Sequence, residues 1–149
     1  MREEAARHRT HMTAYLALFG WSFLAATILP LASEPILIAL VRLRGEFVAP
    51  VAVATAGNYL GACTTYWLAR TAATRLEPLS RTAARHTRAR RLIERFGQPA
   101  LLLSWVPLVG DAIVAVAGGV GIRFLPFSAW TVAGKLARYA TVGWLAAQI

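Results

Sequence analysis

The chain has 149 residues, of which 57% are hydrophobic and only 15% are charged, and its mean hydropathy is +0.51. These values are unusual for a soluble core of this length and indicate one small integral membrane protein. The net charge of +9 comes from clustered basic residues, which the positive-inside rule explains without a nucleic-acid partner.

The first part of the chain is predicted to be a solvated arm followed by a re-entrant hairpin. Residues 1–12 are charged, and no clear A-x-A cleavage site follows at signal-peptide distance, so we expect an arm that stays on the mature chain. The next 29 residues carry Glu34 as their only charge, and Pro30 and Pro35 flank this acid as helix breakers. Two short helical arms therefore fit residues 13–45 better than one spanning helix.

Residues 47–70 are predicted to form a transmembrane helix. The segment holds 23 consecutive uncharged residues, and a span needs about 20. Gly57 and Gly61 lie four positions apart, a small-xxx-small pair that lets another helix approach closely. Asn58, beside them, is a polar group that needs a partner on another helix.

Residues 71–97 are predicted to form a basic amphipathic linker. From position 70 to position 96, eight arginines are set against only Glu77 and Glu94. Apolar residues recur at spacings of three and four, which predicts a pair of helices, interrupted at Pro78, on an anionic membrane surface. The positive-inside rule places this linker in the cytoplasm. Aromatic residues for base stacking are absent among the arginines, which argues against RNA binding.

Residues 98–122 are predicted to form a second re-entrant hairpin. Asp111 is their only charge, and Pro107 and Gly110 interrupt the apolar run beside it. A carboxylate and helix breakers again occur together in an apolar segment, as they do around Glu34.

Residues 124–149 are long enough to span the membrane, but they carry two cations near their middle. These cations are Lys135 and Arg138, and in lipid each needs a carboxylate partner or water. The acids of the two hairpins are the natural partners.

An offset of 77 positions superposes the two halves of the chain. It aligns Gly20 with Gly97, Pro30 with Pro107, Glu34 with Asp111, Phe47 with Phe124, Gly57 with Gly134 and Trp67 with Trp144. Each half is then a hairpin followed by a spanning helix, and because such a unit crosses the membrane an odd number of times, the second half has inverted topology. The predicted fold is therefore an all-α membrane protein of two inverted repeats, in which Glu34 and Asp111 meet near the bilayer midplane, with Asn58, Lys135 and Arg138 nearby.

The side of the N-terminus stays open. A fully re-entrant first hairpin places the arm, Arg42 and Arg44 outside, against the positive-inside rule. A first segment that crosses the membrane once places the arm in the cytoplasm, although Arg42 and Arg44 stay outside.

Acids and cations that share a membrane site suit proton exchange. A carboxylate removed from water holds its proton more tightly, and a nearby cation weakens that hold. This favours a proton-coupled carrier. The alternative is a non-catalytic scaffold in which Glu34 neutralises Arg138, or Asp111 neutralises Lys135, for assembly alone. The carrier is favoured because a structural ion pair does not require broken helices.

An enzyme is not expected. The three histidines lie in the arm and the linker, so none accompanies Asp111 or Ser104 as a nucleophile and base. The single cysteine, Cys63, excludes an internal disulfide, and no Cys, His or Asp cluster has metal-ligand spacing. We therefore predict no catalytic residues, metal or cofactor.

Four motifs resemble those of the DedA (VTT-domain, SNARE-associated) membrane proteins, and most closely the short bacterial YqaA-type subgroup. They are L-P-L-A-S-E-P-I-L around Glu34, A-T-A-G-N-Y-L-G-A-C-T-T-Y-W-L-A-R ending at Arg70, L-L-S-W-V-P-L-V-G-D-A around Asp111, and G-K-L-A-R-Y from Gly134. The resemblance implies two opposed re-entrant hairpins in a multi-pass protein of the bacterial inner membrane. It also implies a role in moving lipids, including undecaprenyl-phosphate and phospholipids, with proton coupling in some members.

The resemblance is uneven along the chain. Glu34 matches the acid of the family's first hairpin, and the helix that contains Gly57, Gly61, Tyr66 and Arg70 matches its glycine-rich helix.

The second hairpin departs from the family pattern. Typical members place two arginines around its proline, where this chain has Ser104 and Gly110. Arginine suits a lipid phosphate, so Lys135 and Arg138 would have to supply that charge here. We predict a transporter or lipid-handling protein with membrane lipids, anionic lipid as substrate and protons as its partners. A homo-oligomer with an interface at Gly57 and Gly61 is a further prediction.

Overall fold

The computed structural model describes residues 2–27, 33–75, 88–106 and 109–148. These residues form helices, with no strand among them, so the prediction of an all-α chain is confirmed for this part. In chain order the helices are α1 (Arg2–Thr27), α2 (Glu34–Arg44), α3 (Val48–Arg75), α5 (Arg88–Phe96), the 3-10 helix η1 (Gln98–Trp105), α6 (Val109–Gly119) and α7 (Phe124–Gln148).

Helices α1 and α2 occupy the region of the first predicted hairpin. Helix α1 runs without a break from Arg2, so the predicted arm is a continuation of this helix. Pro30 lies outside the described residues. Pro35 starts α2 rather than breaking it, because a proline in the first helical turn gives up an N–H that has no intrahelical partner there. Gly45, with a φ of 64°, ends α2 and donates its N–H to the Val41 carbonyl.

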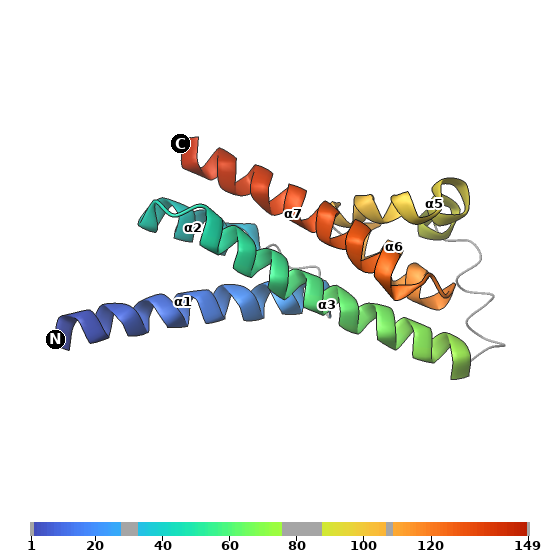
Figure 1. Cartoon of the computed structure of the whole chain (residues 1–149), viewed down its shortest axis with the longest axis horizontal. Helices are drawn as coiled ribbons and strands as arrows, with labels where there is room; N and C mark the ends of the chain where they lie inside the picture. Colours follow the sequence, from blue (N-terminus) through green and yellow to red (C-terminus); the bar gives the residue numbers. More distant parts are fainter. Residues whose placement is uncertain (1, 28–32, 76–87, 107–108, 149) are drawn as a thin grey trace.

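Helices α3 and α7 run side by side in opposite directions (Figure 1). Helix α1 packs closely on α3, because a Cβ at Gly57 would lie 2.5 Å from the Phe19 carbonyl oxygen and one at Gly61 2.4 Å from that of Phe23. The glycine pair therefore brings two helices of the same chain together. Both glycines are buried against α1, so this pair is not open to a second copy of the chain, and the homo-oligomer itself stays a prediction.

The second predicted hairpin is built from η1 and α6. Gly97, with a φ of 65°, precedes η1. Pro107 lies outside the described residues. Gly110 lies in the first turn of α6, so it does not interrupt a helix as predicted. Gly110 instead lets α6 approach η1 closely, because a Cβ at this position would lie 2.4 Å from the Ser104 carbonyl oxygen of η1.

Of the predicted linker, the structure describes the end of α3 and helix α5. The interruption at Pro78 lies outside the described residues. Helix α5 is amphipathic, since Ala89 and Ile93 are buried while Arg91 and Arg95 are exposed, and it packs on α6 and η1.

The helices pack in a paired pattern around α3 and α7. Helix α1 packs on α3 and η1 on α7, while α2 packs on α7 and α6 on α3. Two buried apolar clusters result, one around Leu18, Leu37 and Tyr139 and the other around Tyr66 and Phe127.

Within the described residues, no helix combines the length and the apolarity needed to cross a membrane. This finding includes α3 and α7, which correspond to the predicted spans at 47–70 and 124–149.

Candidate functional site

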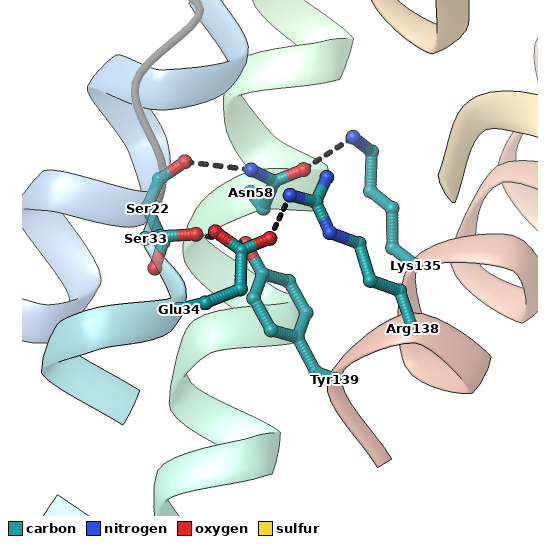
Figure 2. A network of polar contacts seen from close by, with 7 residues as sticks. All are labelled: Ser22, Ser33, Glu34, Asn58, Lys135, Arg138 and Tyr139. Atoms are coloured by element: carbon teal, nitrogen blue, oxygen red, sulfur yellow. Dashed lines mark hydrogen bonds and ion pairs between the residues drawn. The ribbon is translucent and has the colours of Figure 1, made fainter. Parts of the chain in front are cut away.

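An ion pair joins the start of α2 to the middle of α7. Arg138 of α7 donates from Nη2 to Glu34 Oε1 (Figure 2). Glu34 lies in the first turn of α2, where the helix dipole favours a negative charge. The Glu34 and Arg138 side chains are 20% and 16% exposed, so the pair is only partly withdrawn from the surface.

Beside this pair, Lys135 lies almost completely inside the protein, with 2% of its surface exposed. Its ammonium donates to Asn58 Oδ1 of α3. The Asn58 amide in turn donates to the Ser22 carbonyl oxygen of α1, 3.0 Å away. Asn58 therefore links α1, α3 and α7 and supplies a polar partner to a buried cation.

A third contact in this network had no signal in the sequence. The Ser33 and Tyr139 hydroxyls form a buried hydrogen bond 2.6 Å long across 106 residues of chain (Figure 2). Because serine and tyrosine hydroxyls occur throughout the sequence without distinctive spacing, only the fold identifies this pair. It fixes the start of α2 on α7 next to the Glu34–Arg138 ion pair.

Asp111, on the second hairpin, interacts electrostatically with this site. It lies in the first turn of α6 and is half-buried, and the charge that acts on its carboxylate is the ammonium of Lys135. Among the described side chains, however, no cationic nitrogen lies within 4.0 Å of this carboxylate. Each hairpin thus presents one acid to α7, but only Glu34 forms an ion pair with it.

Several buried oxygens around this network lack a hydrogen-bond partner among the described residues. They are Ser22 Oγ, Glu34 Oε2, Thr55 Oγ1 and Thr131 Oγ1. Thr55 precedes Asn58 by three residues and Thr131 precedes Lys135 by four, so each lies one helical turn from the Asn58–Lys135 contact. Unpaired buried oxygens are rare in folded proteins, so these oxygens are available to hydrogen-bond a water molecule or a polar ligand group.

The structure thus brings Glu34, Asn58, Lys135 and Arg138 into one network, with Asp111 in the electric field of Lys135. Their role as a substrate or proton site stays a prediction. Within the described ranges, no group of three or more His, Cys, Asp or Glu side chains has an arrangement that could hold a metal ion.

Comparison with known proteins gives consistent matches over most of the chain. Residues 29–145 match the VTT domain family. The chain is 38% identical over 128 residues to the inner membrane protein YqaA of Escherichia coli, with 85% of this chain and 86% of the relative covered, and the YqaA of Shigella flexneri gives the same values. An uncharacterized protein of Haemophilus influenzae is 36% identical over 133 residues, which cover 84% of this chain and 82% of the relative. No solved structure matches.

Proposed function

The chain belongs to the VTT-domain (DedA) family of membrane proteins, and from this premise we propose that it is a proton-coupled transporter or lipid-handling protein. Like its YqaA relatives, it is a protein of the bacterial inner membrane. The observation that carries the proposal is the position of its charges. Glu34, Lys135 and Arg138 lie together where an interrupted hairpin meets a long helix, at a point where apolar packing would be cheaper.

The way in which the helices pack supports a site that lies between two inverted repeats. Under the offset of 77, the α1–α3 contact corresponds to η1–α7, and the α2–α7 contact corresponds to α6–α3. Helices α3 and α7 correspond to each other and run in opposite directions (Figure 1). A two-fold exchange of the halves therefore maps each of these contacts onto another of them, which suits a transporter whose site lies between its repeats.

Arg138 is the side chain best placed to hold a lipid phosphate. Guanidinium suits phosphate oxygens, and Arg138 is partly accessible, whereas Lys135 is enclosed. In the structure Glu34 occupies this guanidinium. A headgroup phosphate would replace the carboxylate on Arg138, while one of the two acids takes up a proton to offset the added negative charge. Typical members have two arginines in the second hairpin, at positions where this chain has Ser104 and Gly110. Lys135 and Arg138 then take over the role of these arginines.

Reconstitution tests this proposal. The protein would be placed in vesicles of phosphatidylethanolamine and phosphatidylglycerol, and movement of a fluorescent phospholipid between leaflets and of protons across the membrane would be followed. We expect movement with the natural sequence and a loss of about tenfold or more in Glu34→Gln and in Arg138→Gln. The matched control is Arg91→Gln, which removes an exposed arginine on α5 and should leave the rate unchanged.

A non-catalytic scaffold is the second candidate function. It is favoured by the links that the buried polar contacts make between four helices, since the Asn58 contacts join α1, α3 and α7 and the Glu34–Arg138 pair joins α2 and α7. A scaffold moves neither lipid nor protons in these vesicles, and Glu34→Gln then changes only its stability.

A further inference from the structure

We infer that Asp111, and not Glu34, carries the exchangeable proton of the substrate-free site. This inference rests on the proposed function and assigns different roles to its two acids. It rests on a difference between the two acids. Glu34 faces a guanidinium on α7, whereas the cation that acts on Asp111, its counterpart in the second half, is, among the described residues, the more distant ammonium of Lys135.

The ion pair with Arg138 keeps Glu34 ionised. Arginine does not lose its charge in proteins, so the guanidinium stays a permanent partner. The position of Glu34 in the first turn of α2 adds the favourable end of the helix dipole. A proton arriving at this carboxylate would have to break the ion pair that fixes α2 on α7.

Asp111 has no equivalent partner, and the packing explains why. The offset that aligns Asp111 with Glu34 aligns Gly61 with Arg138. A Cβ at Gly61 would lie 2.4 Å from the Phe23 carbonyl oxygen and 2.9 Å from the Ala26 Cβ. No side chain fits at position 61 while α1 keeps its contact with α3, so α3, in the first half of the molecule, cannot supply a guanidinium to Asp111 from this position.

The other groups around Asp111 leave Lys135 as its charged neighbour. Helix α6 packs on α3, η1 and α5. Of these, η1 has no ionisable side chain. Helix α3 contributes Cys63, which interacts with Lys135, and Tyr66 and Arg70, which donate to the Ile122 carbonyl oxygen beyond the far end of α6. On α5, Arg88, Arg91 and Arg95 are exposed and Arg90 pairs with Glu94. On α7, Lys135 and the Tyr139 phenol both interact with the Asp111 carboxylate.

Lys135 is the group that responds to this proton. With Asp111 protonated, the ammonium donates to Asn58, as in the structure. When the Asp111 O–H bond breaks and the proton leaves to water, the carboxylate attracts the ammonium away from Asn58. One proton is released, and the charge left on Asp111 is balanced by the lysine.

Infrared spectroscopy of the purified protein in detergent tests this assignment without a transport assay. The C=O stretch of protonated carboxyl groups would be followed from about pH 4 to about pH 9. We expect one buried carboxyl component that is present in the natural sequence and in Glu34→Gln and absent in Asp111→Asn. Asp111→Glu guards against misfolding of the asparagine variant, since it keeps the carboxyl and should keep the component at a shifted frequency.

A component lost in Glu34→Gln and retained in Asp111→Asn would overturn the assignment, and so would a spectrum that neither variant alters. Failure of the proposed function gives a different result, namely vesicles without lipid or proton movement, whatever the infrared spectra show.

Discussion

Asn58 and Lys135 hydrogen-bond to each other across 77 residues of chain, which is the same offset that aligns the two halves of the sequence. Two positions that correspond under a two-fold exchange come into contact only close to the axis of that exchange. In the proposed inverted repeat, their contact therefore marks the place where α3 and α7 approach each other at equivalent points. Here the corresponding residues differ, since one is an amide and the other a buried cation.

The Asn58–Lys135 contact should show unequal effects of removing each partner. Asn58→Leu leaves the buried ammonium without its amide partner and should lower the free energy of unfolding by about 3–5 kcal/mol. Lys135→Met removes the charge and leaves an unpaired amide oxygen, which costs only about 1–3 kcal/mol. Denaturant unfolding of both variants in detergent measures the difference. Equal losses would mean that the lysine is not held as a buried cation.

The Glu34–Arg138 ion pair should give a measurable coupling in a double-mutant cycle. With Glu34→Gln and Arg138→Gln, we expect a coupling of about 1–3 kcal/mol, because the two side chains are only 20% and 16% exposed. The Arg90–Glu94 pair on α5 is the control, since its side chains are 29% and 57% exposed and its coupling should be only about 0.3–0.5 kcal/mol. Couplings of the same size would show that burial adds nothing to the α2–α7 pair.

Replacing a glycine by alanine should have opposite effects on α3 and α1, because Gly57 packs against another helix and Gly20 does not. Gly57→Ala places a methyl group 2.5 Å from a backbone oxygen of α1, so the helices must separate, at a cost of about 1–3 kcal/mol. Gly20→Ala meets nothing within 4 Å and should stabilise α1 by about 0.5–1 kcal/mol. Thermal unfolding in detergent should therefore shift in opposite directions. A stabilised Gly57→Ala would contradict the close α1–α3 packing.

Charges were the part of the molecule most open to prediction from sequence. A carboxylate in an apolar segment has few partners, so Glu34 and the cations of residues 124–149 could be assigned to one another, and Glu34 lies against Arg138. The prolines were less informative, because Pro35 lies in the first turn of α2, where a proline is accommodated and breaks no helix.

Contacts made by common groups could not be predicted. The Tyr66 hydroxyl donates to the carbonyl oxygen of Ile122, and Arg70 donates to the same hydroxyl. The bond to Ile122 depends on where the turn between α6 and α7 falls against the end of α3, which no spacing in the sequence encodes. For the same reason, the glycine pair at Gly57 and Gly61 indicated close helix packing but not which helix is the partner.

Inverted topology predicts that the turn before α3 and the corresponding turn before α7 lie on opposite sides of the membrane. Glu46 and Arg123 correspond under the offset of 77, both are exposed, and they precede the antiparallel helices α3 and α7. Single cysteines would be placed at Glu46 or Arg123 in a Cys63→Ser background and treated with a membrane-impermeant maleimide. Because the basic linker is predicted to be cytoplasmic, Glu46→Cys should react in intact spheroplasts and Arg123→Cys only in inside-out vesicles. Reaction of both from one side would exclude the inverted arrangement.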